Sequence, residues 1–368
     1  MKYFFIAGER SGDLHASNLI KEINRLDYDA EFVGFGGDMM EEKGMKLLRH
    51  YKEYSFMGLW EVITHLRTIK KKLKQCEEEI KKTAPDVVVL VDFPGFNLRM
   101  AGFAKSLGIK TCYYISPKIW AWKKGRIKTI RKVVDKMLVI LPFEVKFFKE
   151  LEYEVEYVGN PLMDAVRTYD FEKSEETGQT TVAVLPGSRV QELKSAKEVI
   201  LDMARLKPEY KFVVAGVNNL PRSMYAELED TKNVEVVFEK TYDILKQANA
   251  AVVTSGTATL EACLLSAPQV VVYRTSWLTY KVGRAVVNID YLSLVNLIAD
   301  KPVVKELIQD DFNAVMVLEE VDKILNDPAY CGNMLVEYQE IKEKIGHEPA
   351  SKRAANSLME WLKPPSAD

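Results

Sequence analysis

The sequence predicts an α/β protein with two doubly wound domains, each built on a parallel sheet. Short and nearly continuous apolar runs recur along the 368 residues, and each is followed by Gly, Pro, Ser or Asn. Segments with helical periodicity lie between these runs, as in the series Leu59, Ile63, Leu66, Ile69, Leu73 and Ile80. Strands buried on both faces that alternate with helices are typical of parallel sheets built from βαβ units.

The apolar runs define the expected strands in order. In the first half they span residues 3–7, 31–35, 87–91, 111–115, 137–141 and 155–158. In the second half they span residues 181–185, 211–215, 234–238, 251–254 and 269–273. Ligands of such sheets bind at the carboxyl ends of the strands, so the loops after these runs are the places to search for chemistry.

One polar stretch interrupts the series of strands. Residues 170–180 (DFEKSEETGQT) offer no apolar anchor between Phe171 and Val182. We therefore expect a first domain at residues 1–170, a linker at 171–180 and a second domain at 181–345, with a cleft between the domains. Residues 346–368 read as a C-terminal helix and a solvated tail, and we expect the helix to pack on the first domain or to exchange in a dimer.

Composition limits the function classes. The net charge of −2 excludes attraction of the whole protein to nucleic acid or to a membrane, so any such attraction must be local. Four scattered cysteines, without a CxxC pair, indicate free thiols in a reducing compartment. No apolar run approaches the roughly 20 residues that span a bilayer. The sequence predicts a cytoplasmic protein that lies on the surface of any membrane it meets.

A segment with two tryptophans precedes a basic stretch. Ser116-Pro-Lys-Ile-Trp-Ala-Trp122 runs into Lys123, Lys124 and Arg126, and residues 118–136 hold eight Lys or Arg against one Asp. Amphipathic aromatic rings beside cations suit an interface such as a lipid headgroup layer. The alternative is a Trp pair that packs a loop on the core beside a solvated helix.

Two loops of the first half carry acidic groups. Gly8-Glu9-Arg10-Ser11-Gly12-Asp13 follows the first strand, and its glycines allow a ligand to approach the backbone. Its carboxylates would repel a pyrophosphate, which favours a sugar hydroxyl or an acceptor. Asp92 follows the strand at 87–91, where desolvation could raise its pKa toward that of a general base. Capping of the next helix explains Asp92 equally well.

Two loops of the second half predict a nucleotide-diphosphate site. Gly187 and Ser188 would present backbone N–H groups to a diphosphate, and Arg189 would present a bidentate fork. The helix that begins at Ser255, Gly256 and Thr257 would bind phosphate oxygens with its first amides. Glu261, one turn further, suits the ribose hydroxyls. No metal-ligand spacing occurs, so Arg189 and helix dipoles are expected to neutralise the diphosphate in place of Mg²⁺.

Eight motifs, in order, resemble the lipid-A-disaccharide synthase family. They are Ala7-Gly-Glu-x-Ser-Gly-Asp13, Phe56-Met-Gly-x-x-Glu-Val62, Asp92-x-Pro-x-Phe-Asn97, Ser116-Pro-x-x-Trp-Ala-Trp122, Leu141-Pro-Phe-Glu144, Leu185-Pro-Gly-Ser-Arg189, Ser255-Gly-Thr-Ala-x-Leu-Glu261 and Tyr291-x-Ser-Leu-x-Asn296. The resemblance runs from residue 5 to about residue 310.

The resemblance implies an inverting GT-B glycosyltransferase with two Rossmann-like domains, the first on the acceptor side and the second binding the UDP-sugar. It would join UDP-2,3-diacylglucosamine to 2,3-diacylglucosamine 1-phosphate through a β-1,6 bond and release UDP. Asp92 matches the family's proposed base, Arg189 its essential arginine and Glu9 its acidic residue in the first loop. Three further residues match the donor side: Glu261, Asn296 and Gln309.

The same resemblance implies substrates and partners. The UDP-sugar is a substrate, so no cofactor is expected, and a homodimer with exchanged C-terminal segments is implied. Since both sugars carry acyl chains, we expect peripheral association with the inner membrane. Phe56, Met57 and Trp60 form a candidate acyl-facing stripe, which core packing explains equally well. Ser116, Trp120, Trp122, Lys123, Lys124 and Arg126 complete the candidate acceptor and membrane side.

Departures and alternatives remain. The family usually has Asp at the position of Gly95, Gly at that of Ala16 and Pro at that of Val295. The alternative within enzymes is another UDP-sugar GT-B protein, either a polyprenyl-lipid N-acetylglucosamine transferase or a UDP-sugar 2-epimerase. From another class, residues 118–136 could serve a non-catalytic module that binds membrane or nucleic acid.

Overall fold

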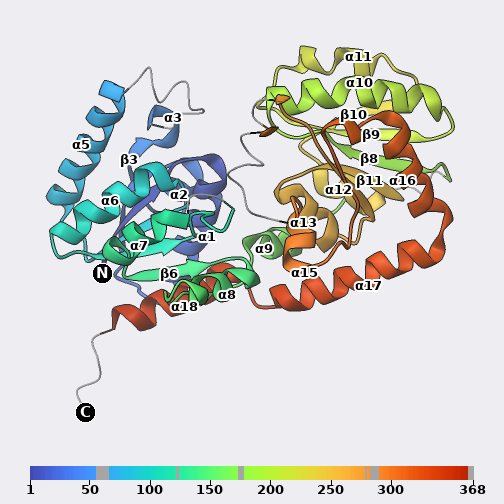
Figure 1. Cartoon of the computed structure of the whole chain (residues 1–368). Helices are drawn as coiled ribbons and strands as arrows, with labels where there is room; N and C mark the ends of the chain where they lie inside the picture. Colours follow the sequence, from blue (N-terminus) through green and yellow to red (C-terminus); the bar gives the residue numbers. More distant parts are fainter. Residues whose placement is uncertain (55–65, 122–123, 173–177, 278–279, 282–289, 364–368) are drawn as a thin grey trace. The chain divides into compact units, whose positions relative to one another are not determined.

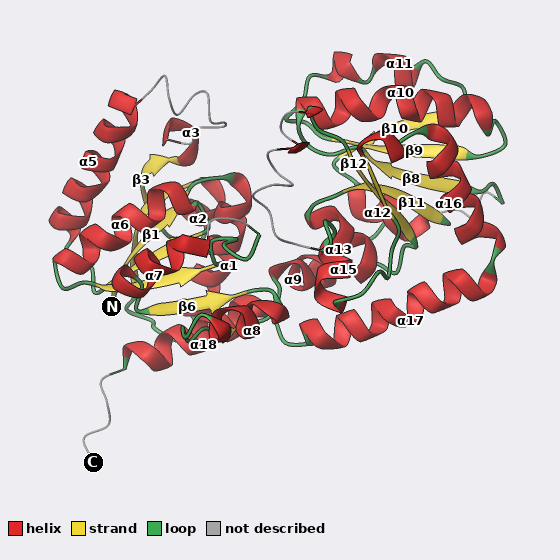
Figure 2. Ribbon diagram, in the orientation of Figure 1, coloured by secondary structure: helices red, strands yellow, loops and turns green. Residues whose placement is uncertain are grey.

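A computed structural model describes residues 1–54, 66–121, 124–172, 178–277, 280–281 and 290–363 (Figures 1 and 2). The chain forms two compact units. The first joins Met1–Pro161 to Glu348–Asp368, and the second comprises Leu162–His347. The first unit thus ends nine residues before the boundary expected at residue 170. The helix α9 (Pro161–Thr168) leads into the second unit.

The first unit contains a parallel sheet of seven strands in the order β3-β2-β1-β4-β5-β6-β7. The strands are β1 (Lys2–Ala7), β2 (Glu31–Gly36), β3 (Lys46–His50), β4 (Val87–Val91), β5 (Lys110–Tyr114), β6 (Lys136–Val139) and β7 (Glu156–Tyr157). The helices are α1 (Arg10–Ile23), α2 (Asp38–Glu42), α3 (Tyr51–Tyr54), α5 (Leu66–Thr83), α6 (Pro94–Ser106), α7 (Ile127–Val133), α8 (Pro142–Glu150) and α18 (Ala350–Leu362).

Both faces of this sheet are buried, because alternate side chains of each strand enter different cores. Phe4 and Ile6 of β1 belong to the core that includes Ala101 and Ala104 of α6. Tyr3, Phe5 and Ala7 belong to the other core, with residues of α1 and α18. Such double burial explains why the strands read as continuous apolar runs.

The last helix of the chain belongs to the first unit. Ala354, Ala355 and Leu358 of α18 are buried in the same core as Leu19 of α1, and Ser357 donates a hydrogen bond to Glu156 at 2.6 Å. This helix is red in Figure 1, and its packing with α1 joins the two ends of the chain. Side-chain packing of α18 therefore completes the core of the N-terminal unit.

The second unit contains a parallel sheet of six strands in the order β10-β9-β8-β11-β12-β13. The strands are β8 (Thr181–Leu185), β9 (Lys211–Gly216), β10 (Val234–Phe238), β11 (Ala250–Thr254), β12 (Gln269–Tyr273) and β13 (Glu306–Ile308). The helices after α9 are α10 (Val190–Leu206), α11 (Ala226–Glu229), α12 (Thr241–Gln247), α13 (Thr257–Leu264), α15 (Leu294–Ala299), α16 (Ala314–Asn326) and α17 (Pro328–Ile345).

All eleven expected strands are present within two residues at either end, and β3 and β13 are additional. Within the described ranges, no helix combines the length and the apolar character needed to cross a bilayer. In each sheet the direction of strand addition reverses beside the first strand, between β1 and β4 and between β8 and β11. Ligands of open α/β sheets bind at such reversal points.

Candidate functional site

Two acidic loops meet at the reversal point of the first sheet. Ala7 pairs with Val91 at the ends of β1 and β4, so the loops that carry Glu9 and Asp92 leave the same edge side by side. Gly8 is buried, and a Cβ at this position would overlap the ring of Phe93. Only glycine allows the two loops to pack this closely, which accounts for the first glycine of the motif.

The backbone at Asp92 is held in a strained conformation. Asp92 and Phe93 have φ angles of 45° and 49°, in the left-handed region that residues other than glycine rarely occupy. The carbonyl oxygen of Asp92 accepts hydrogen bonds from the hydroxyl of Tyr113 at 2.6 Å and from Nδ2 of Asn97 at 2.7 Å. Both donor side chains are fully buried. These two contacts fix the direction of the Asp92 side chain.

The electrostatic environment of Asp92 suits a proton acceptor. Burial raises the pKa of Asp92 to about 6, the nearby Lys118 lowers it, and Glu9 raises it. The helix α6 begins at Pro94 without a side-chain cap, so Asp92 does not act as the helix cap of the alternative interpretation. A carboxyl group with this pKa is ionised at neutral pH and still basic enough to take a proton.

The remaining acids of the first loop have different roles. Glu9 is exposed and accepts a hydrogen bond from Ser11 at 2.7 Å. The carboxylate of Asp13 is buried and accepts hydrogen bonds from the backbone amides of Gly37, Met39 and Met40. Asp13 therefore caps the first turn of α2, which leaves Glu9 as the acidic side chain of this loop that is open to a ligand.

Gly95 is the second residue of α6, and a Cβ there would meet no heavy atom within 4 Å. We therefore expect Gly95→Asp to raise the free energy of unfolding by about 1 kcal/mol. A helix loses less entropy without glycine, and an acid at its N-terminus is favourable. Urea unfolding measures the change, and Gly95→Ala isolates the backbone contribution. An aspartate variant less stable than the wild type would contradict this expectation.

The segment with the two tryptophans is largely internal where it is described. Ser116 is 2% exposed and donates a hydrogen bond to Glu144, and Trp120 is 8% exposed with its ring perpendicular to Phe143 at 5.1 Å. Neither side chain is presented to a lipid surface, so Trp120 fits the packing alternative. Lys124 is exposed and Arg126 half-buried. Phe56, Met57, Trp60, Trp122 and Lys123 lie outside the described residues.

Glu144 is a buried carboxyl group that the residue-by-residue reading missed. Besides the Ser116 hydroxyl, it accepts the amides of Leu141 at 2.9 Å and Ile140 at 3.2 Å. Burial raises the pKa of Glu144 to about 7, and the hydrogen bonds from Ser116 and the backbone oppose this rise. A Pro followed two residues later by Glu at the start of a helix was the available signal for this capping role.

At the reversal point of the second sheet, backbone amides of the expected diphosphate loop donate hydrogen bonds to a side chain of the following helix, α10. The amides of Ser188 and Arg189 donate to the carboxylate of Glu192 at 2.9 and 3.1 Å, and Gly187 has a φ of 96°. The Ser188 amide is therefore occupied in this conformation, and its contact with a diphosphate stays a prediction. Glu192 satisfies this amide because a helix N-terminus attracts any nearby carboxylate. The Arg189 side chain remains 82% exposed.

The neighbouring loop after β11 has an uncapped helix N-terminus. Both donors of Ser255 are used within the protein. Its amide donates to the carbonyl of Val272 and its hydroxyl donates to the carbonyl of Leu292, each at 2.9 Å. Gly256 and Thr257 are exposed, and α13 begins without a side-chain cap. Glu261 accepts a hydrogen bond from Tyr242 at 3.0 Å, and burial raises its pKa. Its contact with a ribose stays a prediction.

Asn296 and Gln309 hold the backbone in this structure. Asn296 is 1% exposed, accepts the amides of Val303 and Val304 and donates to Glu306, each at 2.9 Å. Gln309 pairs its amide group with the backbone of Thr275 at 2.8 and 3.1 Å. These side chains already have protein partners, so a direct contact with a sugar donor stays a prediction. Val295, a departure from the family pattern, is fully buried.

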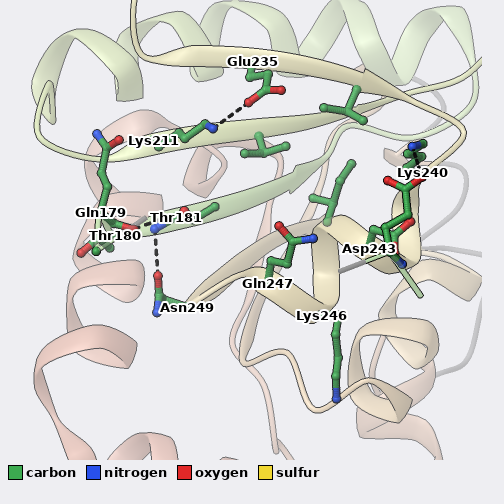
Figure 3. Close-up of a pocket in the computed structure, with 15 residues that line it drawn as sticks. Gln179, Thr180, Thr181, Lys211, Glu235, Lys240, Asp243, Lys246, Gln247 and Asn249 are labelled. Atoms are coloured by element: carbon green, nitrogen blue, oxygen red, sulfur yellow. Dashed lines mark hydrogen bonds and ion pairs between the residues drawn. The ribbon is translucent and has the colours of Figure 1, made fainter. Parts of the chain in front are cut away.

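A cavity of about 620 Å³ lies along the second sheet, from residues that begin β8 and β9 to Lys240 and Asp243, which follow β10 (Figure 3). Thr181 and Lys211, which begin β8 and β9, line it, and Lys211 forms an ion pair with Glu235 at 2.7 Å. Among the residues that the structure describes, none of the predicted site residues lines this cavity. Within the ranges that the structure describes, no three His, Cys, Asp or Glu side chains are grouped as for a metal ion.

Comparison with known proteins decides the family. A profile of the family described as lipid-A-disaccharide synthetase matches residues 3–359. The chain belongs to this family. The lipid-A-disaccharide synthase of Geobacter sulfurreducens is 36% identical over 373 residues, which cover 98% of this chain and 97% of that protein. The predicted glycosyltransferase family is thereby confirmed.

Solved structures confirm the predicted fold class. The glycosyltransferase of kitacinnamycin superposes with a TM-score of 0.71 at 15% identity and covers 99% of both chains. The UDP-GlcNAc 2-epimerase from Neisseria meningitidis, bound to UDP-GlcNAc, gives 0.69 at 14% identity, over 98% of this chain and 100% of that chain. Because transferases and epimerases share this fold, the structural likeness establishes only the GT-B α/β architecture.

Proposed function

We propose that the chain transfers 2,3-diacylglucosamine from UDP-2,3-diacylglucosamine to the 6-hydroxyl of 2,3-diacylglucosamine 1-phosphate. The products are a β-1,6-linked disaccharide and UDP. The observation that carries this proposal is Asp92, a partly desolvated carboxylate at the reversal point of the first sheet, whose backbone carbonyl is held by Tyr113 and Asn97. Family membership over nearly the whole chain supports the choice of substrates.

In the proposed reaction, Asp92 accepts the proton of the 6-hydroxyl as that oxygen forms a bond to the anomeric carbon. The bond between this carbon and the diphosphate breaks on the opposite face, and its electron pair leaves with UDP, which inverts the anomeric configuration. Arg189 and the amides at the start of α13 would stabilise the departing negative charge without a metal ion. Glu261 would receive hydrogen bonds from the ribose.

The decisive experiment is mass spectrometry of the product formed from defined diacyl substrates. A disaccharide monophosphate is expected only when both sugars are present. Assays of UDP release with and without the acceptor exclude the epimerase alternative, because an epimerase reaches its equilibrium without any acceptor. If no disaccharide forms from these diacyl substrates, the proposal is rejected.

We also propose that the protein is cytoplasmic and docks peripherally on the inner membrane through the basic face that includes Lys124 and α7. Lys128, Arg131 and Lys132 of α7 are exposed, and each cation near an anionic surface contributes about 1 kcal/mol. Sedimentation with anionic vesicles should fall about tenfold or more after Lys124→Gln and Lys128→Gln together. Retained binding would refute this surface. A homodimer, with or without exchange of α18, is a further proposal that light scattering tests.

A further inference from the structure

Lys118 stands out within an otherwise internal loop. The structure describes every residue of 115–121, and among these seven Lys118 alone is exposed, whereas five are buried or nearly so and Ala121 is half-buried. The resemblance to the synthase family leaves the residue type at this position open, since it falls on an unspecified place of the motif Ser116-Pro-x-x-Trp.

The loop that carries Lys118 is held in place from both sides. The amide of Ile115, which has a φ of 66°, donates to Leu138 at 3.0 Å, and Ser116 is bound to the buried Glu144. On the other side, the amide of Ala121 donates to the carbonyl of Lys118 at 3.2 Å, and Trp120 packs on Phe143. The main chain at Lys118 is therefore fixed. The position of the ammonium group depends on the rotamers of the side chain alone.

Lys118 lies on the loop next to the candidate base. Strand β5 is the neighbour of β4, with Tyr114 opposite Val91, so the loop after β5 leaves the sheet beside Asp92. The charge of Lys118 is close enough to oppose the rise in the pKa of Asp92 that burial causes. Among the described residues, no carboxylate lies within ion-pair distance of the Lys118 ammonium group, so its charge is not neutralised by a direct partner there.

A second cation lies on the same side of Asp92. The charge of Arg126 opposes the rise in the pKa of Tyr113 that burial causes, and the hydroxyl of Tyr113 donates to the carbonyl of Asp92. The opposite side of Asp92 holds the carboxylate of Glu9. A phosphorylated acceptor that brings its hydroxyl to Asp92 would be repelled by these two carboxylates unless a cation compensates them.

We propose that Lys118 binds the phosphate of the acceptor sugar while the 6-hydroxyl of that sugar lies at Asp92. This inference rests on the proposed function. The 1-phosphate is carried by C1 and the reacting 6-hydroxyl by C6 on C5, and C1 and C5 flank the ring oxygen. The two groups are therefore neighbours on one side of the sugar, and a cation one loop away from the base is suitably placed for the phosphate. A lysine serves such a role as a flexible point charge that donates charge-assisted hydrogen bonds.

The test compares two acceptors, 2,3-diacylglucosamine 1-phosphate and the same sugar without phosphate, by the ratio of their kcat/KM values. Lys118→Gln is expected to lower this preference for the phosphorylated acceptor about 10- to 100-fold, the usual effect of one hydrogen bond between charged groups. KM for the donor should not change. Lys118→Arg should retain most of the preference. Lys146→Gln on the exposed face of α8 is the matched control and should behave as the wild type.

Two results would overturn the inference. An unchanged preference in Lys118→Gln would show that the phosphate binds elsewhere. An equal loss with both acceptors, accompanied by an upward shift of the acidic limb of the pH profile, would show that Lys118 acts only on the ionisation of Asp92. Both results require an active wild type, so a wild type that forms no disaccharide would instead reject the proposed function.

Discussion

Asp92→Asn is expected to lower kcat by about 10²- to 10⁴-fold, the usual contribution of a positioned general base. Asparagine has nearly the same shape but cannot accept the proton of the 6-hydroxyl. The hydrogen bonds from Tyr113 and Asn97 go to the backbone carbonyl of residue 92, so the substitution leaves them in place. Asparagine also tolerates the φ of 45° at least as well as aspartate does.

Two measurements accompany this substitution. Burial penalises the charged form of Asp92, because it raises the folded-state pKa from 3.8 to about 6. The ionised carboxylate therefore reduces stability progressively as pH rises through this interval, and the asparagine variant should be at least as stable as the wild type at neutral pH. In the wild type, kcat/KM should fall about tenfold for each pH unit below about 6. Near-wild-type turnover in the asparagine variant, with UDP affinity retained, would contradict the assignment of Asp92 as the general base.

Arg189→Ala is expected to lower kcat/KM for the donor by about 10²- to 10³-fold, since a preorganised positive group at a departing diphosphate is usually worth that much. Folding should not change, because the side chain is 82% exposed and its ion-pair partner in the structure is Glu192. Arg189→Lys keeps the charge but not the bidentate geometry, so its kcat/KM for the donor should lie between those of the wild type and of Arg189→Ala.

Arg205→Ala is a matched control for Arg189→Ala. Arg205 lies in α10, the helix that follows Arg189, is 77% exposed and forms a similar ion pair with Asp202 three residues away at 3.0 Å. Loss of a surface ion pair of this kind changes stability by less than about 1 kcal/mol. Steady-state kinetics and calorimetric titration with UDP separate the two arginines. Equal effects of both substitutions would count against a specific role of Arg189 at the diphosphate.

Eleven strands were predictable, including the edge strands β7 and β10, and the two that were missed, β3 and β13, also lie at sheet edges. Periodicity placed β4, β8, β10 and β12 to the residue, because these strands are apolar runs bounded by polar residues. Strand β3 was missed because its five residues, Lys46–His50, include basic side chains and are partly exposed. They therefore do not form a continuous apolar run. Strand β13 has three residues and joins the sheet edge only through its pairing with β12, a contact that local sequence does not encode.

The site was predictable where one loop carries the chemistry, as at Asp92, and not where distant residues cooperate. The hydrogen bond from Tyr113 to Asp92 joins β5 to the loop after β4, and its existence depends on the register between these two strands. The occupation of the Ser188 amide by Glu192 was readable in principle, since an acid at the third position of a helix commonly caps it. The hydrogen bond of Asn296 to Glu306 joins residues ten positions apart, and it could be recognised only in the folded structure.

The position of α18 in the first unit sets an order of events during synthesis. The second unit is one continuous segment, Leu162–His347, whereas the first needs residues from both ends of the chain. A ribosome synthesises the whole second unit before it reaches the sequence of α18. Until then, the face of α1 formed by Ala16, Leu19 and Ile20 has no helix to cover it. The N-terminal unit, although translated first, is therefore the last to mature, and its exposed apolar face is a natural target for chaperones in the interval.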